Sequence, residues 1–330
     1  MSGPHPSVAA TRVAVREALD GLDFASRIWV AVSGGPDSLA LAAAAGFVAR
    51  KVGYHVGAII VDHGMQEGSA EVARRAAEQV RKAGIVTVHI ETVTVGRDGG
   101  REAAARTARY AALEARADAE GGITPHILTG HTMDDQAETV LLALARGSGA
   151  RALAGIPPKR GRYIRPFLGL RRSDTVAACD ALGLEPWHDP TNAPDGGPRR
   201  SLLRGTVMPA LVDVLGPGVV SGLARSAALL QADADELDRQ ARSTLSATES
   251  HGDTEAWRCT MLADLPDAIR TRMLKMIAEE AGAGPLGSTH VGALDKLVTS
   301  YSGQGAVYLP GGYEAIREYG RLIIRHPLER

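Results

Sequence analysis

Residues 27–38 read RIWVAVSGGPDS, an apolar run followed directly by a turn that contains two glycines. A short apolar run that ends in a glycine-containing turn is typical of a buried strand. Residues 37–51 are rich in alanine and leucine, and they predict a helix immediately after the turn. A strand, a tight turn and a helix in this order form the first unit of an α/β fold.

The same alternation of strand and helix continues through the first half of the chain. Regular alternation with short turns favours a doubly wound parallel sheet with helices on both faces. Ligands of such sheets bind at the carboxyl ends of the strands, so the residues after each strand are the candidates for chemistry. The further strands are predicted at 55–61, 86–93 and 126–129, and the further helices at 69–83, 101–119 and from 133 to about 146.

Beyond residue 146 the pattern changes. Residues 147–170 are rich in Gly, Pro and Arg and predict a loop that contributes no domain core. We expect a catalytic domain over residues 1–215 and a smaller α+β accessory domain over residues 220–330. The later segments predict helices at 171–182, 200–244 with two breaks, 268–281 and 289–300, and strands at 305–309, 313–318 and 322–325.

Composition excludes several classes of protein. The 330 residues include 37 Lys and Arg against 38 Asp and Glu, which excludes a strongly basic nucleic-acid-binding protein but not a local basic patch. The two cysteines, Cys179 and Cys259, form no CxxC pair, which argues against a disulfide scaffold, a zinc ribbon and a cysteine-held iron–sulfur cluster. No apolar run approaches the roughly 20 residues that span a bilayer, and the N-terminus has no signal-like apolar segment. We expect a soluble, cytoplasmic protein without a membrane partner.

The SGGPDS turn has the features of an anion-binding loop. Gly34 and Gly35 allow a tight backbone whose N–H groups point inward, and the following helix adds the positive end of its dipole. Ser33 and Ser38 add hydroxyl donors. Asp37 lies inside the loop, and a carboxylate beside phosphates requires a bridging divalent cation such as Mg²⁺. The loop is neither a Walker A nor a GxGxxG sequence, and the alternative is an ordinary capped strand–helix turn.

A second group of polar residues, HTMDDQAET, follows the fourth predicted strand. If the helix begins near residue 133, Asp135 and Glu138 share one helix face, with His131 one turn earlier. Two carboxylates at this edge suit a substrate ammonium and can take its proton, and His131 suits phosphate or transition-state charge. The alternative is a helix start enriched in acids by its dipole, which accounts for Asp134 and Asp135 alone.

The SGGPDS loop resembles the SGGxDS loop of the N-type ATP pyrophosphatases, and VDHG at 61–64 resembles the segment near the adenine in one branch of them. Together with HTMDDQAET, the loop is similar to the tRNA(Ile)-lysidine synthetase family. The resemblance runs from about residue 27 to 215, with Ser201 where the family usually has Asn. Further matching strings are EAAARTARY at 102–110, RGSG at 146–149, RPFL at 165–168, DPTN at 189–192 and RSLLR at 200–204.

The resemblance implies a reaction, its cofactors and roles for particular residues. In the family, ATP adenylates the wobble cytidine of an isoleucine tRNA with a CAU anticodon, and the ε-amino group of free L-lysine then displaces AMP. Asp135 and Glu138 would hold the lysine, and Asp37 would contact Mg²⁺ through the phosphates. The implied catalytic residues are Asp37, His131, Asp135, Glu138 and Arg109, and ATP would lie against Ser33, Gly34, Gly35, Asp37, Ser38, Asp62, His63 and Gly130. Arg106 is expected to help Arg109 and His131 hold phosphate.

A tRNA substrate needs a positive surface, which bulk charge does not supply. Residues 157–172 contain basic residues and no acidic one, although the alternative is a solvated charged loop. Tyr163 and Phe167 in this stretch are available for base stacking. The basic residues expected to contact tRNA are Lys159, Arg160, Arg162, Arg165, Arg200 and Arg204.

Three other functions remain as alternatives. A tRNA cytidine thiolase of the same superfamily would need cluster cysteines, which Cys179 and Cys259 do not supply. NAD and GMP synthetases lack the HTMDDQAET string. A non-catalytic tRNA-binding module would not need the intact carboxylates Asp37, Asp135 and Glu138. The sequence leaves the oligomeric state open, including a homodimer.

Overall fold

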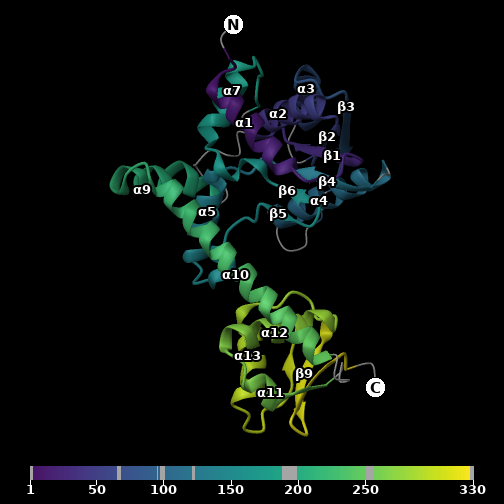
Figure 1. The fold of residues 1–330 in the computed structure, drawn as a ribbon, viewed down its shortest axis with the longest axis vertical. Coiled ribbons are helices and arrows are strands. Elements are labelled where there is room, and N and C mark those ends of the chain that lie inside the picture. Colours follow the sequence, from purple (N-terminus) through teal and green to yellow (C-terminus); the bar gives the residue numbers. More distant parts are fainter. Residues whose placement is uncertain are drawn as a thin grey trace. The chain divides into compact units, whose positions relative to one another are not determined.

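The computed structural model describes residues 3–64, 68–94, 96, 101–120, 123–187, 199–249 and 256–327. The chain divides into two compact units, Met1–Leu230 and Gln231–Arg330, and the long helix α10 (Val219–Glu249) contains the boundary between them (Figure 1). Each unit is described by itself below. No single helix of the described ranges is long and apolar enough to cross a membrane; only one bent pair, Arg199–Leu215 with Val219–Ala247, passes that test jointly.

The first unit contains a six-stranded sheet with the order β3-β2-β1-β4-β6-β5. Strands β1 to β4 are parallel neighbours, β6 is parallel to β4, and β5 pairs antiparallel with β6. The predicted α/β class is therefore confirmed. The strand bounds are β1 (Ser26–Val32), β2 (His55–Asp62), β3 (Thr87–Thr92), β4 (Ile123–Leu128), β5 (Lys159–Arg160) and β6 (Tyr163–Ile164).

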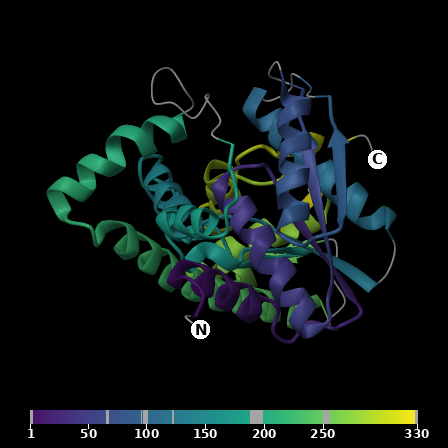
Figure 2. The same ribbon diagram turned by 90° about the horizontal axis from the view of Figure 1, so that it is seen from above.

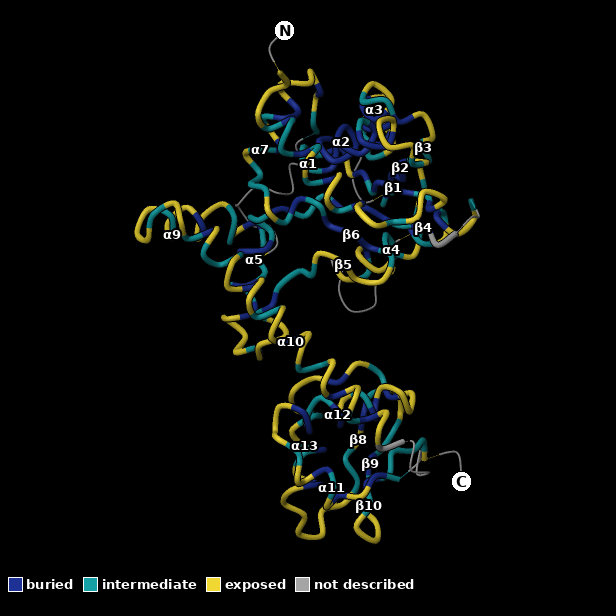
Figure 3. The backbone as a smooth tube through the Cα atoms, in the orientation of Figure 1, coloured by how far each residue is buried: buried dark blue, intermediate teal, exposed yellow. Residues whose placement is uncertain are grey.

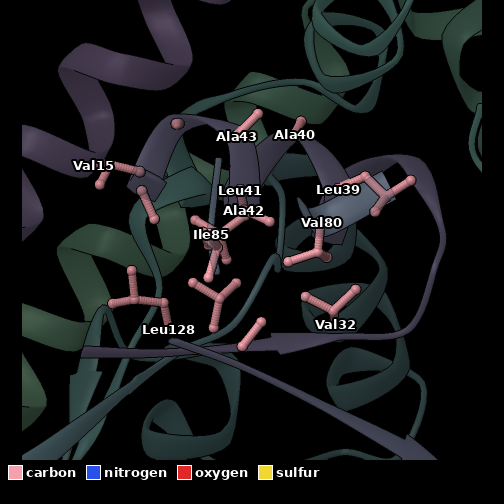
Figure 4. Close-up of a cluster of buried hydrophobic side chains, with 14 of the residues drawn as sticks. Val15, Val32, Leu39, Ala40, Leu41, Ala42, Ala43, Val80, Ile85 and Leu128 are labelled. Carbon is pink, nitrogen blue, oxygen red and sulfur yellow. The ribbon is translucent and has the colours of Figure 1, made fainter. Parts of the chain in front are cut away.

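Side chains of β1 alternate between two apolar layers. Ile28, Val30 and Val32 belong to the larger cluster, which also contains apolar residues of α1 (Pro6–Leu19), α2 (Pro36–Val52), α3 (Ser69–Lys82) and α7 (Arg172–Ala181) (Figure 4). Trp29 belongs to a second cluster with Leu113 and Ala117 of α4 (Arg101–Ala119). Because successive strand residues face opposite sides, α3 and α4 cover opposite faces of the sheet (Figure 2).

Small residues let helix α2 pack closely on the sheet. Residues 39–45 of this helix are all buried, and five of these seven are alanine (Figure 3). A methyl group at Gly46 would lie 3.2 Å from the Ala83 carbonyl oxygen. The alanine-rich sequence that predicts the helix thus also explains how its N-terminus is held firmly at the end of β1.

The segment 147–170 differs from the prediction. It forms α6 (Ala150–Leu153), the β5–β6 hairpin and the 3₁₀ helix η1 (Pro166–Gly169), and Ile164 and Phe167 are part of the larger apolar cluster. The prediction that this segment contributes no core is wrong, because β6 adds to the sheet edge beside β4 and η1 places Phe167 in the apolar cluster. Helix α1 was not predicted either, although Val8, Val15 and Leu19 are buried on one side of it.

The remaining described elements of the first unit are helical. Helix α5 (Met133–Leu144) packs through Ala137 against Met208 and Val220, which belong to α9 (Met208–Leu215) and α10. Between α7 and α9, the structure describes α8 (Arg199–Leu202) and a π-helical turn, η3 (Leu203–Val207). This arrangement brings arginines of α8 and η3 to the start of α5.

The second unit has its own four-stranded antiparallel sheet, in the order β7-β10-β9-β8. A separate apolar cluster, with Met273, Leu274 and Leu294 fully buried, packs its helices onto this sheet. The α+β character expected for this part of the chain is present. Its elements are β7 (Ala256–Arg258), α11 (Cys259–Ala263), α12 (Asp267–Glu280), α13 (Ser288–Thr299), β8 (Val307–Tyr308), η4 (Pro310–Gly312), β9 (Glu314–Glu318) and β10 (Arg321–Arg325).

Candidate functional site

A cavity of about 360 Å³ lies at the carboxyl ends of β1, β2 and β4, and we call it the sheet-edge cavity. The strand order reverses its direction of winding beside β1, which is where doubly wound sheets bind their ligands. Ile59, Val61 and Leu113 give the cavity an apolar floor. Its lining also includes nine of the residues predicted to form the site: Ser33, Asp37, Ser38, Asp62, His63, Arg106, Arg109, Gly130 and His131.

The SGGPDS loop forms one wall of the cavity and is held by its own serines. The Ser33 backbone N–H donates to Ser38 Oγ at 3.2 Å, and Ser38 Oγ donates to the Gly35 carbonyl at 3.0 Å. Gly34 has a φ of 87°, a conformation that favours glycine. Helix α2 begins at Pro36, so the positive end of its dipole faces the loop. These features are those of a phosphate-binding loop.

Gly130 allows the loop after β4 to pass against the start of α2. A methyl group at this position would lie 3.0 Å from the backbone carbonyl carbon and oxygen of Asp37. The role of Gly130 is thus the close approach of two backbones, which brings His131 and α5 next to the SGGPDS loop.

Asp62 and His63 form the wall at the end of β2. Asp62 is buried, and its carboxylate accepts the Gly64 N–H at 3.0 Å. Burial lowers the pKa of His63, and the positive charge of Arg109 lowers it further. Its Nδ1 is buried without a hydrogen-bond partner among the described residues. His63 therefore offers a neutral ring with an available polar atom to a bound ligand.

His131 lies at the opposite wall, held by Thr129, whose Oγ1 is 2.9 Å from His131 Nδ1. Burial lowers the pKa of His131 to about 4, although Asp135 acts in the other direction. The imidazole is therefore neutral at pH 7. It can donate a hydrogen bond to developing negative charge but does not supply a full positive charge.

Asp135 and Glu138 face the same side of α5 and contact three arginines; we call this group the carboxylate–arginine cluster. Glu138 is only 2 % exposed and accepts from Arg204 Nε at 2.7 Å and from Arg200 Nε at 3.1 Å. Asp135 accepts from Arg172 Nη2 at 2.9 Å. Burial would raise the pKa of Asp135, but Arg172 and the Thr132 N–H together hold it below its ordinary value. Asp135 is thus charged, and both carboxylates are paired with arginines.

Arg172 connects this cluster to the SGGPDS loop. Its Nε donates to Asp37 Oδ2 at 3.2 Å, while its Nη1 lies 3.8 Å from Glu138 Oε1. Burial raises the pKa of Asp37 in spite of Arg172 and the hydrogen bond from Thr175. The sequence placed Arg172 on a basic surface, and its spatial role between the carboxylates was missed because α7 reaches them from a distant part of the chain.

The basic residues predicted to contact tRNA separate into two groups. Arg200 and Arg204 belong to the carboxylate–arginine cluster, whereas Lys159, Arg160, Arg162 and Arg165 lie on the β5–β6 hairpin and its end. A second hollow, the hairpin groove, lies between this hairpin and α4. It is lined by Arg106, Thr107, Tyr110, Ala111, Glu114, Arg160, Gly161, Arg162, Tyr163 and Arg165.

Tyr163 and Phe167 do not provide exposed stacking surfaces. Tyr163 is 7 % exposed and donates its hydroxyl to Glu114 at 2.8 Å, and Phe167 is fully buried. The expectation that they stack on bases is wrong, because β6 and η1 turn both side chains into the protein. Trp187, which the sequence did not single out, lines the sheet-edge cavity, and its backbone N–H donates to the Gly34 carbonyl at 2.9 Å. The DPTN string at 189–192 lies outside the described residues.

The donor set suits a cation bound largely by a ligand's phosphates. Among the described residues, no group of three or more His, Cys, Asp or Glu side chains could hold a metal ion by itself. Asp37 places one carboxylate at the phosphate loop, which matches the usual Mg²⁺ pattern of one or two carboxylates plus substrate phosphates.

The parallel sheet with a glycine-rich phosphate loop after its first strand defines a PP-loop protein, and a model described as a PP-loop domain matches residues 10–211. A second model, described as the TilS substrate binding domain, matches residues 258–323. The chain belongs to the tRNA(Ile)-lysidine synthase family.

Relatives support this assignment over nearly the full length. The tRNA(Ile)-lysidine synthase of Thermobifida fusca is 51 % identical, over 98 % of this chain and 99 % of the relative. That of Salinispora tropica is 49 % identical over 99 % of each chain, and that of Mycobacterium tuberculosis is 45 % identical over 91 % of this chain and 90 % of the relative.

A solved structure shares the fold. The U34-tRNA thiolase NcsA of Methanococcus maripaludis, solved with its [4Fe-4S] cluster, superimposes with a TM-score of 0.56. It is 20 % identical in sequence, and the match covers 68 % of this chain and 80 % of that chain. At this identity the likeness concerns the fold alone.

Proposed function

We propose that the protein ligates free L-lysine to the wobble cytidine of an isoleucine tRNA with a CAU anticodon, and that ATP is cleaved to AMP and pyrophosphate in the process. The observation that carries this proposal is the meeting of the phosphate loop and the carboxylates at one sheet edge. Arg172 contacts Asp37 of the loop on one side and Asp135 and Glu138 of α5 on the other. An activating site and an amine site are thus adjacent.

ATP is proposed to occupy the sheet-edge cavity. The apolar floor and the end of β2, with Asp62 and His63, suit the base, while the SGGPDS loop suits the phosphates. Asp37 would hold Mg²⁺, which supplies charge neutralisation between the phosphates when bound. Arg106, Arg109 and neutral His131 line the same cavity and are placed to bind the negative charge of the adenylate.

Asp135 and Glu138 are proposed to receive the lysine side chain. An ammonium must lose a proton before its nitrogen can attack carbon 2 of the adenylated cytidine, and a carboxylate at that point holds the ammonium and accepts the proton. The amine nitrogen then forms the new bond as AMP leaves. Since Arg172, Arg200 and Arg204 contact these carboxylates, lysine has to share or replace arginine contacts when it binds.

Family membership favours lysidine formation over the rival functions. Cys179 and Cys259 are both buried, each in a different unit, and the Cys179 thiol donates to the Pro36 carbonyl. Burial raises the pKa of Cys179 to about 12, so it is a poor nucleophile or sulfur carrier. We also propose that the protein acts in the cytoplasm.

The direct test is exchange of pyrophosphate into ATP with unmodified isoleucine tRNA, followed by incorporation of labelled lysine. We expect exchange that depends on this tRNA, and incorporation only when lysine is added. Elongator methionine tRNA, which shares the CAU anticodon, is the matched control. Exchange that is independent of the isoleucine tRNA, or sulfur incorporation in place of lysine, would overturn the proposal.

A further inference from the structure

The hairpin groove adjoins the sheet-edge cavity. Arg106 and Tyr110, both on α4, line the two hollows at once. Arg106 Nη2 donates to the Tyr110 hydroxyl at 3.2 Å, and Arg165 lies close enough to this hydroxyl to interact with it electrostatically. The junction between cavity and groove is therefore formed by two guanidinium groups that share one tyrosine.

Positive charge in the groove is balanced only in part by carboxylates. Within the described ranges, Arg106, Arg160 and Arg165 form no ion pair, while Arg162 pairs with Asp118 at 2.7 Å. The groove does contain Glu114, whose carboxylate accepts the Tyr163 hydroxyl. Three unpaired guanidinium groups against one carboxylate leave a net positive hollow, which attracts an anion.

Arg165 provides the observation that points to a particular kind of ligand. Its side chain is only 8 % exposed, and its Nε is buried without a hydrogen-bond partner among the described residues. Nη1 donates to the Pro157 carbonyl at 2.7 Å, which fixes the guanidinium plane. Burial lowers the pKa of Arg165, and neighbouring Arg106 and Arg160 lower it further. A buried donor with repelling cations around it is stabilised by an anionic acceptor.

We infer that Arg160 and Arg165 bind the RNA phosphodiester next to the reacting cytidine, at the mouth of the sheet-edge cavity, while Arg106, which lines both hollows, keeps its proposed contact with the adenylate. The inference rests on the proposed function for the identity of the RNA. Phosphate contacts fix the register of a nucleic acid, and a nucleotide whose base undergoes chemistry must leave its stack. With the neighbouring phosphate in the groove, the cytidine itself lies at the junction, close to His131 in the adjoining cavity.

The test neutralises the phosphate and the arginine separately and together. Anticodon stem-loop RNA is prepared with a methylphosphonate on the 5′ or the 3′ side of the wobble cytidine, and its Kd is measured for wild-type protein and for Arg160→Gln. For one of the two positions, we expect each single change to weaken binding about tenfold. Their combination should be no weaker than either alone, because both changes remove the same contact.

Further variants keep the test decisive. Arg165→Gln should behave as Arg160→Gln does, and the exposed Arg160 preserves the test if the buried Arg165 variant fails to fold. Arg16 is exposed on α1 and lies outside both hollows. With Arg16→Gln, the methylphosphonate should therefore weaken RNA binding as much as it does with wild-type protein. Additive penalties at both RNA positions would overturn the inference.

The measurement also separates the two sources of phosphate. If the groove binds a phosphate of ATP, Arg160→Gln will raise the KM for ATP and leave the methylphosphonate penalty at its wild-type size, which overturns the RNA assignment. If no lysidine forms but the penalties are non-additive, the phosphate site stands and the proposed function falls. If lysidine forms but the penalties are additive, the proposed function stands and the phosphate site falls.

Discussion

Asp135 combines two tasks in one side chain. Its Oδ2 accepts the Thr132 N–H at 2.9 Å and the Thr132 hydroxyl at 3.0 Å, which fixes the start of α5, while its Oδ1 points to Arg172 and Arg204. Because two hydrogen bonds hold Oδ2, the carboxylate cannot rotate away from the carboxylate–arginine cluster. The capping hydrogen bonds of Oδ2 thus orient Oδ1 toward the proposed amine site.

The role of this oxygen is tested by Asp135→Asn. The amide retains a capping oxygen but has lost the negative charge, so we expect lysine incorporation to fall at least about 100-fold in kcat/KM, with ATP affinity nearly unchanged. Asp134→Asn is the matched control, since the Asp134 carboxylate contacts the Arg171 side chain and only the backbone of Arg172, outside the carboxylate–arginine cluster. Wild-type turnover by Asp135→Asn would contradict the assigned role.

His131 leads to a prediction about pH. Its pKa is about 4 in the folded protein against 6.5 for an ordinary histidine, so the unfolded chain takes up a proton that the folded protein does not as the pH falls from 6.5 to 4. The free energy of unfolding should therefore decrease over this range, by about 3 kcal/mol for this group. His131→Gln should flatten the decrease.

Titration of the ring by NMR checks the same point independently. The His131 carbon-bound proton signals should stay constant from pH 8 to pH 5 and shift only below that. A midpoint near 6.5 would show that the imidazole becomes charged at physiological pH, contrary to the neutral donor inferred from its burial.

At the scale of the elements, two loops meet at Gly130. Gly130→Ala places a methyl group against the Asp37 backbone, so the two loops must separate. We expect a loss of about 1–3 kcal/mol in the free energy of unfolding and a higher KM for ATP. Gly149→Ala is the control, because nothing lies within 4 Å of its added methyl group. Equal behaviour of the two variants in thermal unfolding and ATP kinetics would contradict this account.

Local patterns predicted the elements that carry local signals. The α4 range 101–119 agrees with the structure, and the strand–loop–helix unit at 27–51 differs by only a residue at each end. The β5–β6 hairpin has strands of only two residues, too short for a periodic pattern, and its position depends on pairing with β4. Helix α1 did carry a signal, in the spacing of Val8, Val15 and Leu19.

The candidate site was also predictable only in part, because some of its residues come together only through contacts between distant segments. The loop residues Ser33–Ser38 and the α5 carboxylates stand in contiguous strings, so the sequence brought them together. Arg172, Thr175 and Trp187 reach the site from distant segments, and no local spacing connects them with Asp37 or Gly34. Contacts of this type depend on the completed fold.

For the whole molecule, the two units have separate apolar cores that share no residue. Leu274→Ala in α12 should reduce the stability of the second unit by about 2–5 kcal/mol, because the side chain is fully buried there. Hydrogen exchange should then lose protection in residues 256–327 while β1, β2 and α2 keep theirs. Leu229→Ala, at an exposed position of α10, is the control. Equal loss of protection in both units would mean that they unfold together.

Arg172 has a consequence for the order in which ligands act. One guanidinium contacts both Asp37 on the phosphate loop and Asp135 on α5. A ligand that changes one of these two contacts therefore also changes the free energy of the other contact. Such coupling is reciprocal: if ATP with Mg²⁺ changes the affinity for lysine, lysine must change the affinity for ATP by the same factor. With ATP and lysine bound as proposed, occupation of one site would thus be felt at the other without movement of a domain.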